Sequence, residues 1–147
     1  MGTLRELANS SPAKRQQVID LAIPVIDAEV SDKGGISGMA IKAAYAMTKG
    51  LAPGMIVKIL DNLMDDFLDA LQPFYDESKQ KGVDLRTMLD SRRTEAANAL
   101  LAITDERASK ESGGPMKKGY EKLRPTAEKH VEAAVPRLAD LITKIGA

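Results

Sequence analysis

Two carboxylates in one predicted helix have the spacing best suited to chemistry in this chain. The run Asp65-Asp66-Phe67-Leu68-Asp69 places Asp65 and Asp69 four residues apart. On a helix this spacing puts both side chains on the same face, where they can hold a hard cation such as Mg²⁺. The chain has no cysteine and a single histidine, so neither thiol chemistry nor a structural zinc site is expected.

The acidic run is similar to the DDxxD motif of the all-helical prenyl synthases, which holds Mg²⁺ against the diphosphate of an isoprenoid substrate. Those enzymes resemble one another in carrying a second acidic motif and in being much longer than this chain. The best second candidate, Asp84 to Asp90, lacks the pattern. The solvated face of an amphipathic helix explains residues 65–69 equally well. A Mg²⁺-dependent isoprenoid-diphosphate enzyme is therefore only the third hypothesis, and we expect a protein that is not an enzyme.

His130 is the only imidazole available for acid–base chemistry. A catalytic role would require a nucleophile or a carboxylate that the fold brings next to it. Its neighbours Lys129 and Glu132 are instead typical of an ordinary boundary position on a helix. We therefore expect no catalytic residue, no metal site and no cofactor.

The stretch 34–64 combines small residues, methionines and lysines. Small residues recur there at helical spacing, as Gly34/Gly38, Ala40/Ala44 and Ala46/Gly50. Such a helix lets another backbone approach closely, and that contact would offset the cost of about 1 kcal/mol for a helical glycine. Methionines recur nearly every eight residues and can line an adaptable groove. The predicted binding surface consists of Gly38, Met39, Lys42, Tyr45, Ala46, Met47, Lys49 and Met55.

Helices must position these residues, because 3.6-residue periodicity recurs along the chain and strand-like alternation is almost absent. Residues 1–10 suit a short separate N-terminal helix, and 109–116 reads as a linker to a C-terminal helical region that is interrupted near Pro125. Between these segments, the apolar periodicity and the Pro, Gly and capping signals predict helices over about 12–33, 37–49, 53–81 and 84–109.

The fold class that follows is all-α. We predict one compact domain over residues 1–147, built as a bundle of five or six helices. Proline bends are expected at Pro24, Pro73 and Pro136. Aromatic residues are scarce, so the core should be aliphatic.

Charge excludes some partners. Twenty-one basic residues balance twenty-one acidic ones, so a nucleic acid partner is not expected. Residues 61–77 carry six acids, and Met116–His130 carries five Lys and Arg against two Glu, so we expect these two segments to neutralise each other. No targeting segment and no apolar stretch of about 20 residues is present. We therefore expect a cytoplasmic protein with no transmembrane segment.

Three stretches resemble an uncharacterised bacterial family of small all-helical proteins, a domain of unknown function. They are Ile26 to Lys33, Gly38 to Lys42, and Tyr120 to Pro125 running on through Lys129 to Pro136. The resemblance implies a bacterial source and an all-helical domain. It carries no activity, substrate or site residue.

Two binding functions lead the hypotheses. The first is a non-enzymatic interaction protein whose Gly/Ala/Met-rich region 36–64 packs closely on a helix of its own chain, of a second copy or of another protein. The second is an apolar-ligand or membrane-surface module, in which the methionine face takes up an acyl chain while Lys42 and Lys49 meet anionic lipid headgroups. Both hypotheses use the same apolar face, so the sequence does not separate them.

Overall fold

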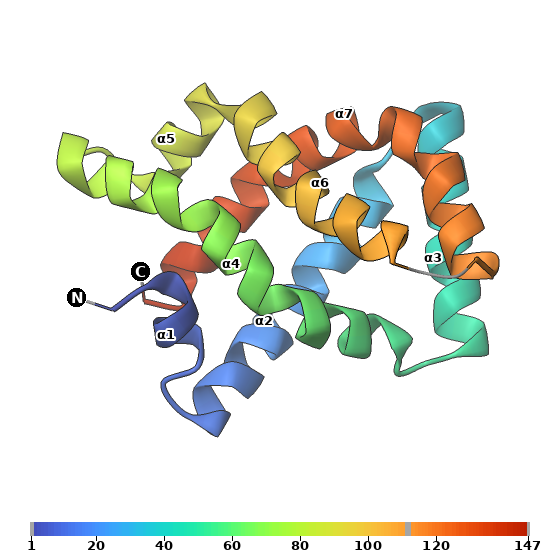
Figure 1. The fold of residues 1–147 in the computed structure, drawn as a ribbon, viewed down its shortest axis with the longest axis horizontal. Helices are drawn as coiled ribbons and strands as arrows, with labels where there is room; N and C mark the ends of the chain where they lie inside the picture. The colour runs from blue at the N-terminus through green and yellow to red at the C-terminus, as the bar shows by residue number, and fades with distance from the viewer. Residues whose placement is uncertain (1, 111–112, 147) are drawn as a thin grey trace.

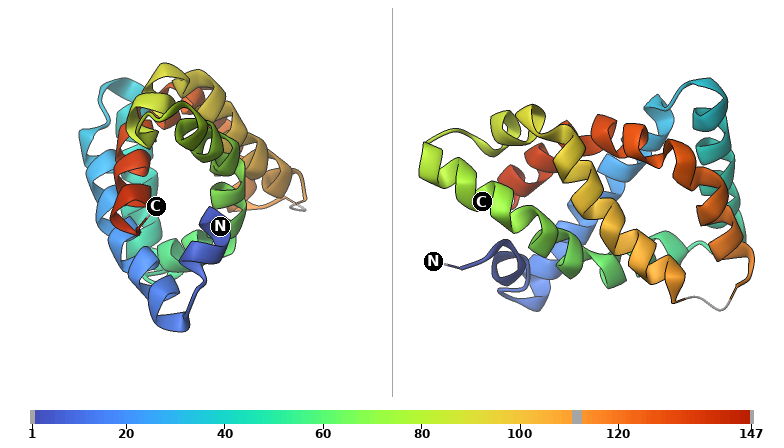
Figure 2. Two further views of the ribbon diagram at one scale, coloured as in Figure 1. Left: turned by 90° about the vertical axis from the view of Figure 1, so that its left-hand side faces the viewer. Right: turned by 45° about the horizontal axis from the view of Figure 1, so that its top comes forward.

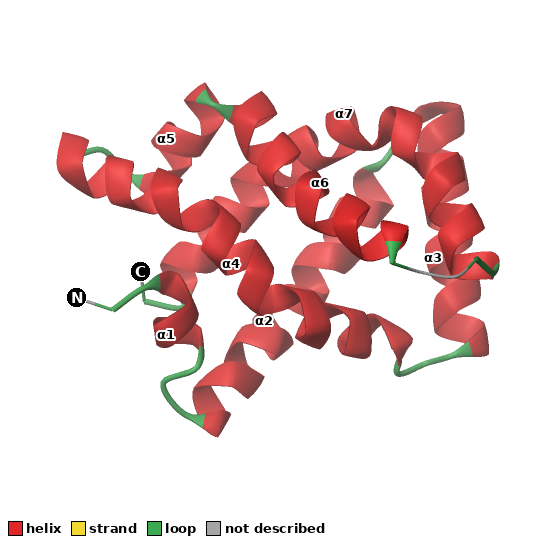
Figure 3. Ribbon diagram, in the orientation of Figure 1, coloured by secondary structure: helices red, strands yellow, loops and turns green. Residues whose placement is uncertain are grey.

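Helices joined by short loops make up the protein (Figures 1 and 3). The computed structural model describes residues 2–110 and 113–146, and within these ranges there are seven helices and no strand. The helices are α1 (Leu4–Ala8), α2 (Pro12–Asp32), α3 (Gly35–Leu51), α4 (Met55–Lys81), α5 (Leu85–Ser91), α6 (Arg93–Ser109) and α7 (Pro115–Lys144). The all-α prediction is confirmed, and the predicted number of five or six helices is wrong.

The additional helix arises at Arg92, which ends α5 and begins α6. The guanidinium of Arg92 lies 4.6 Å from the centre of the Phe74 ring and pairs with Glu77 and Glu95. These contacts hold the bend between the two helices. No proline or glycine marks the break, so the sequence reads as one helix from Asp84 to Ser109.

Capping residues set several helix ends where the sequence indicates them. The Ser11 hydroxyl accepts a hydrogen bond from the Lys14 backbone N–H, and Pro12 occupies the first turn of α2. Asp84 accepts one from the Thr87 N–H at 2.7 Å and begins α5. At the end of α4, Gly82 adopts φ 67°, a left-handed conformation that glycine tolerates without steric cost.

Prolines lie inside three of the long helices without ending them. α2 continues through Pro24, α4 through Pro73, and α7 through both Pro125 and Pro136. The predicted interruption near Pro125 is therefore wrong. The ribbon of α7 arches along its length instead, as the right-hand view of Figure 2 shows.

The predicted linker 109–116 falls partly outside the described residues, at positions 111 and 112. On either side of that gap, α6 ends at Ser109 and α7 begins at Pro115. Gly113 and Gly114 precede α7 with φ of 109° and 106°, which side-chain-bearing residues rarely adopt.

The hydrophobic core occupies only part of the molecule. It is built from the C-terminal part of α4, from α5, α6 and the C-terminal part of α7, and it is closed by α1 and the first half of α2. Its most deeply buried large side chains are Leu4, Leu89, Val135 and Ile145. The core is aliphatic apart from Phe74, as the composition requires.

α3 lies outside this core. No residue from 24 to 59 belongs to the core cluster or packs against it. α3 contacts α2, α4 and α7 at the end of the molecule far from both termini (Figure 1). Of its seventeen residues only Gly38 is buried.

This asymmetry predicts a difference between two leucine truncations. Leu89 is completely buried, so Leu89→Ala should lower the free energy of unfolding by about 2–5 kcal/mol. Leu51 ends α3 with 82% of its surface exposed, so Leu51→Ala should change it by no more than about 0.5 kcal/mol. Urea unfolding of both variants measures the difference. Equal losses would place α3 inside the cooperative core.

Candidate functional site

The outer face of α3 carries four large apolar side chains that are exposed to solvent. We define it by the large side chains Ile36, Met39, Met47 and Leu51, which are 90%, 69%, 63% and 82% exposed. Helical spacing brings these four side chains to one side of α3, together with the alanines between them. Scattered exposed apolar residues are ordinary on a protein surface, whereas several on one side of a helix are a feature typical of binding surfaces.

The charged side chains of α3 and of the segments next to it have one sign. Residues 33–60 contain four lysines and no aspartate or glutamate. Lys42 and Lys49 lie one turn either side of Tyr45 along one flank of α3, and both are exposed. The outer face of α3 is therefore an apolar surface beside cations, with no acid of its own helix to compensate them.

The inner side of α3 starts with a close backbone contact at Gly38. A Cβ atom on Gly38 would lie 2.7 Å from the carbonyl carbon of Lys33, closer than real Cβ contacts allow. Gly38 therefore permits the tight turn from α2 into α3. In contrast, a Cβ on Gly34 or Gly50 would meet no atom within 4 Å.

A cluster of charged side chains fixes the start of α3. The Lys33 ammonium donates to the Glu29 carboxylate at 2.8 Å and to the backbone carbonyl of His130 on α7, also at 2.8 Å. Arg137 of α7 pairs with both Glu29 and Asp32 of α2. Lys33 and Glu29 have only 9% and 13% of their side-chain surface exposed, so this pair is far better shielded from solvent than most ion pairs of the protein.

His130 completes the cluster by contacting α3 directly. Its Nε2 lies 3.0 Å from the hydroxyl of Ser37, in the first turn of α3. Burial, followed by the nearby positive charges of Lys33 and Lys129, lowers the pKa of His130 below its usual 6.5. The imidazole is therefore neutral at pH 7. The nearby carboxylates of Glu29 and Asp32 are paired with Lys33 and Arg137, and no hydrogen bond joins His130 to a carboxylate among the described residues.

The second half of α3 is fastened through Tyr45. Its hydroxyl donates a short hydrogen bond to Asp27 of α2, and the Lys49 ammonium lies 3.4 Å from the same carboxylate. Burial and the bond to Asp27 raise the pKa of Tyr45 to about 12. The Tyr45 bond is also the main cause of the lowered pKa of Asp27.

The structure divides the predicted binding residues between two sides of α3. Met39, Lys42, Ala46 and Met47 are exposed, whereas Gly38 and Tyr45 face the body of the protein. Lys49 is exposed but interacts with Asp27, and Met55 begins α4 and is half-buried. The sequence reasoning missed Ile36 and Leu51, which extend the outer face at both ends. Their positions on the same helical arc as Met39 and Met47 were the available signal.

The small residues expected to pack closely are largely in contact with solvent. Ala44, Ala46 and Gly50 are exposed, and only Gly38 makes the close approach that the spacing predicted. Internal helix packing therefore does not explain this composition.

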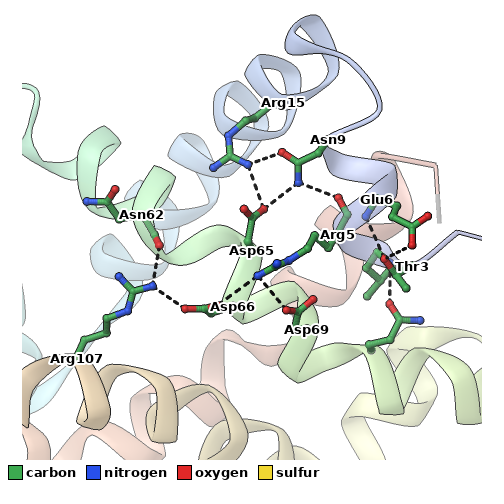
Figure 4. Close-up of polar contacts among 12 residues, drawn as sticks. Thr3, Arg5, Glu6, Asn9, Arg15, Asn62, Asp65, Asp66, Asp69 and Arg107 are labelled. Carbon is green, nitrogen blue, oxygen red and sulfur yellow. Dashed lines mark hydrogen bonds and ion pairs between the residues drawn. The ribbon is translucent and has the colours of Figure 1, made fainter.

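The acidic run 65–69 is held by arginines (Figure 4). Asp65 accepts hydrogen bonds from Asn9 and Arg15, Asp69 pairs with Arg5 at 3.0 Å, and Asp66 lies between Arg5 and Arg107. Burial opposes ionisation of Asp65, but these hydrogen bonds outweigh it and lower its pKa. The acidic run thus braces α4 against α1, α2 and α6.

For Asp61, Asp65, Asp66 and Asp69 the observed partners are arginines and not the lysines expected from the basic segment 116–130. Arg5, Arg15 and Arg107 all lie outside that segment and pair with these four acids of α4. Their side chains reach the carboxylates from α1, α2 and α6, which the sequence pattern did not connect with α4. Within residues 2–110 and 113–146, no group of three or more His, Cys, Asp or Glu side chains is arranged to hold a metal ion.

The fold and the outer face of α3 define the class of this protein, which is an all-helical domain with an apolar helix on its surface. In the described part of the chain, none of the helices has both the length and the apolar character needed to cross a membrane. The chain belongs to a family of unknown function, DUF6918, whose model matches residues 5–145. The expected resemblance to an uncharacterised helical family is thereby confirmed. No curated protein and no solved structure matches the chain.

The two glycines at either end of α3 predict opposite effects of the same substitution. Gly38→Ala should lower stability by about 1–3 kcal/mol, because its Cβ would overlap the Lys33 backbone. Gly50→Ala should raise stability by up to about 1 kcal/mol, because alanine favours the helix and meets no neighbour. Thermal unfolding by circular dichroism measures both. If Gly38→Ala leaves the thermal stability unchanged, the close turn between α2 and α3 is refuted.

His130 predicts a loss of stability in mild acid. Because its pKa is lower in the folded protein, the unfolded chain takes up a proton first as the pH falls below 6.5. The contribution of the neutral imidazole is therefore complete above pH 6.5 and decreases as the pH falls toward the folded-state pKa. Urea unfolding across this range should show the decrease. His130→Gln, which retains a polar group near Ser37 but does not titrate, should flatten this part of the profile.

Proposed function

We propose that the protein is a non-enzymatic binding protein that attaches to an anionic lipid surface through the outer face of α3. The observation that carries this proposal is the exposure of Ile36, Met39, Met47 and Leu51 on a helix that lies outside the core. Apolar side chains of this size gain free energy on leaving water, about 25 cal/mol for each Å² buried. An interfacial helix gains it by inserting one face among lipid headgroups.

The charge of residues 33–60 favours an anionic surface. Lysines near such a surface add about 1 kcal/mol each to binding. Lys42 is exposed and forms no salt bridge with a described residue, so it is available to phosphate groups. Lys49 can exchange its 3.4 Å contact with Asp27 for a lipid phosphate at small cost, because both side chains are half-exposed.

The rigid attachment of α3 also supports surface binding. The Lys33–Glu29–Arg137 cluster fixes one end of the helix, and the Tyr45–Asp27 bond fixes its middle. A helix held in this way presents its apolar side chains without having to fold on contact, which lowers the entropic cost of association.

A second copy of the chain is the alternative occupant. Pairing two outer faces would bring the lysines of both α3 helices together, and residues 33–60 offer no carboxylate to neutralise them. Like charges in such an interface oppose association. This charge argument is the reason for choosing the lipid surface.

The acidic run gives no support to the enzyme hypothesis. The carboxylates of Asp65 and Asp69 point to Arg15 and Arg5 and would have to leave these partners to bind Mg²⁺. We therefore propose binding as the activity.

Vesicle sedimentation tests the proposal with the full chain. The protein should sediment with vesicles that contain phosphatidylglycerol, bind less as salt rises, and bind weakly to phosphatidylcholine alone. Met39→Glu combined with Met47→Glu should abolish this binding, because two carboxylates then enter the lipid-facing surface. The variant should unfold like the natural chain, since both positions are exposed.

A matched variant controls for the added charge. Gln80→Glu with Val83→Glu adds the same two charges at exposed positions near the end of α4, far from α3 in Figure 1, and should leave vesicle binding intact. Absence of vesicle binding by the natural chain would refute the proposal. A dimer in light scattering that Met39→Glu/Met47→Glu dissociates, without vesicle binding, would assign the face to a second copy.

A further inference from the structure

A second apolar surface lies between α4, α6 and α7 and forms a groove of about 450 Å³. This volume is within the range of small-molecule sites in proteins. Met55, Ile59 and Leu63 form one wall, since their spacing of four residues places them along one side of α4. None of the three belongs to the hydrophobic core.

The opposite wall comes from α6 and α7. Ala108 contributes a small side chain, and Tyr120 contributes its ring. The Tyr120 hydroxyl lies 2.7 Å from the Thr104 hydroxyl and donates to Asp105, which Arg124 also holds. These hydrogen bonds orient the Tyr120 side chain through its hydroxyl, and its ring remains available to an apolar ligand in the groove.

Cations lie along the groove without acids among them. Lys58, Arg107 and Lys117 are part of its lining, and no described residue that lines it is an aspartate or glutamate. Arg107 is positioned by a hydrogen bond to the Asn62 carbonyl and by Asp66, 2.6 Å away. Lys58 is exposed in the first turn of α4, next to Ile59 of the apolar wall.

This combination fits a molecule with one long apolar part and one anionic end. We infer that the groove binds a single long-chain fatty acid anion. Its alkyl chain lies against Ile59, Leu63 and Tyr120, and its carboxylate is held by Lys58 and Arg107. A neutral hydrocarbon would make no use of the exposed Lys58 ammonium, and a small anion would leave the apolar walls in water.

The inference does not rest on the proposed function, because it concerns other helices and other residues. The outer face of α3 consists of residues 36 to 51, whereas the groove begins at Met55. Each site can therefore be removed by substitution without altering the other.

Calorimetric titration of the full chain with oleate, below its micellar concentration, tests the inference. Oleate should bind, and octanoate should bind at least about tenfold more weakly because it buries fewer methylene groups. Ala108→Phe should abolish binding by filling the groove with a ring. Lys58→Glu should raise Kd about fivefold, because it replaces an attractive charge by a repulsive one.

Matched control variants separate the loss of oleate binding at the groove from general effects of an added ring or a reversed charge. Ala102→Phe places the same ring at an exposed position of α6 that does not line the groove, and Lys42→Glu reverses a charge on α3. Both variants should bind oleate like the natural chain. Met39→Glu/Met47→Glu should also keep oleate binding, so loss of the membrane site and loss of the groove are distinguishable.

Two results would overturn the inference. One is the absence of oleate binding by the natural chain. The other is unchanged affinity in Lys58→Glu together with unchanged affinity in Ala108→Phe. If Ala108→Phe does not fold, as judged by circular dichroism, Lys58→Glu decides alone, because Lys58 is exposed and makes no ion pair with any residue that the structure describes.

Discussion

The shielded pair between Lys33 and Glu29 is the interaction on which the arrangement of α3 depends. Glu29 lies in the last turn of α2 and Lys33 follows directly after that helix, where its ammonium also bonds to the carbonyl of His130 on α7. A charge with so little contact with water requires its partners, because removing one leaves the other buried without compensation. The pair therefore fixes where α2 ends, how α7 passes it and in which direction α3 departs.

Much of the fold follows from the sequence because its signals are local. Ser11-Pro12, Asp84 and Gly82 mark helix ends through hydrogen bonds and dihedral angles that involve neighbouring residues only. The break at Arg92 has no such local cause. It depends on Phe74, Glu77 and Glu95, and two of these three residues belong to another helix. A contact of this kind between two helices does not change the apolar periodicity of the sequence.

The two candidate sites also differ in how far the sequence predicts them. Met39 and Met47 could be selected from the sequence because a single helix carries the whole outer face of α3. The groove could not be predicted from the sequence, because Lys58, Arg107 and Tyr120 come from three helices whose packing must be known first. The acidic run 65–69 shows the opposite error. Its spacing suits a metal ion, but the arginines that occupy it come from distant segments that the pattern does not mention.

The separation of α3 from the core also has a consequence for motion. Helices that share few buried apolar contacts with the rest of a protein open at a lower free energy than the global unfolding transition. The backbone amides of α3 should therefore exchange with solvent deuterium through local opening, while those around Leu89 and Val135 exchange only when the whole chain unfolds. Anything that holds the outer face of α3 would act first on this local equilibrium, and would slow exchange there without a comparable effect on the core.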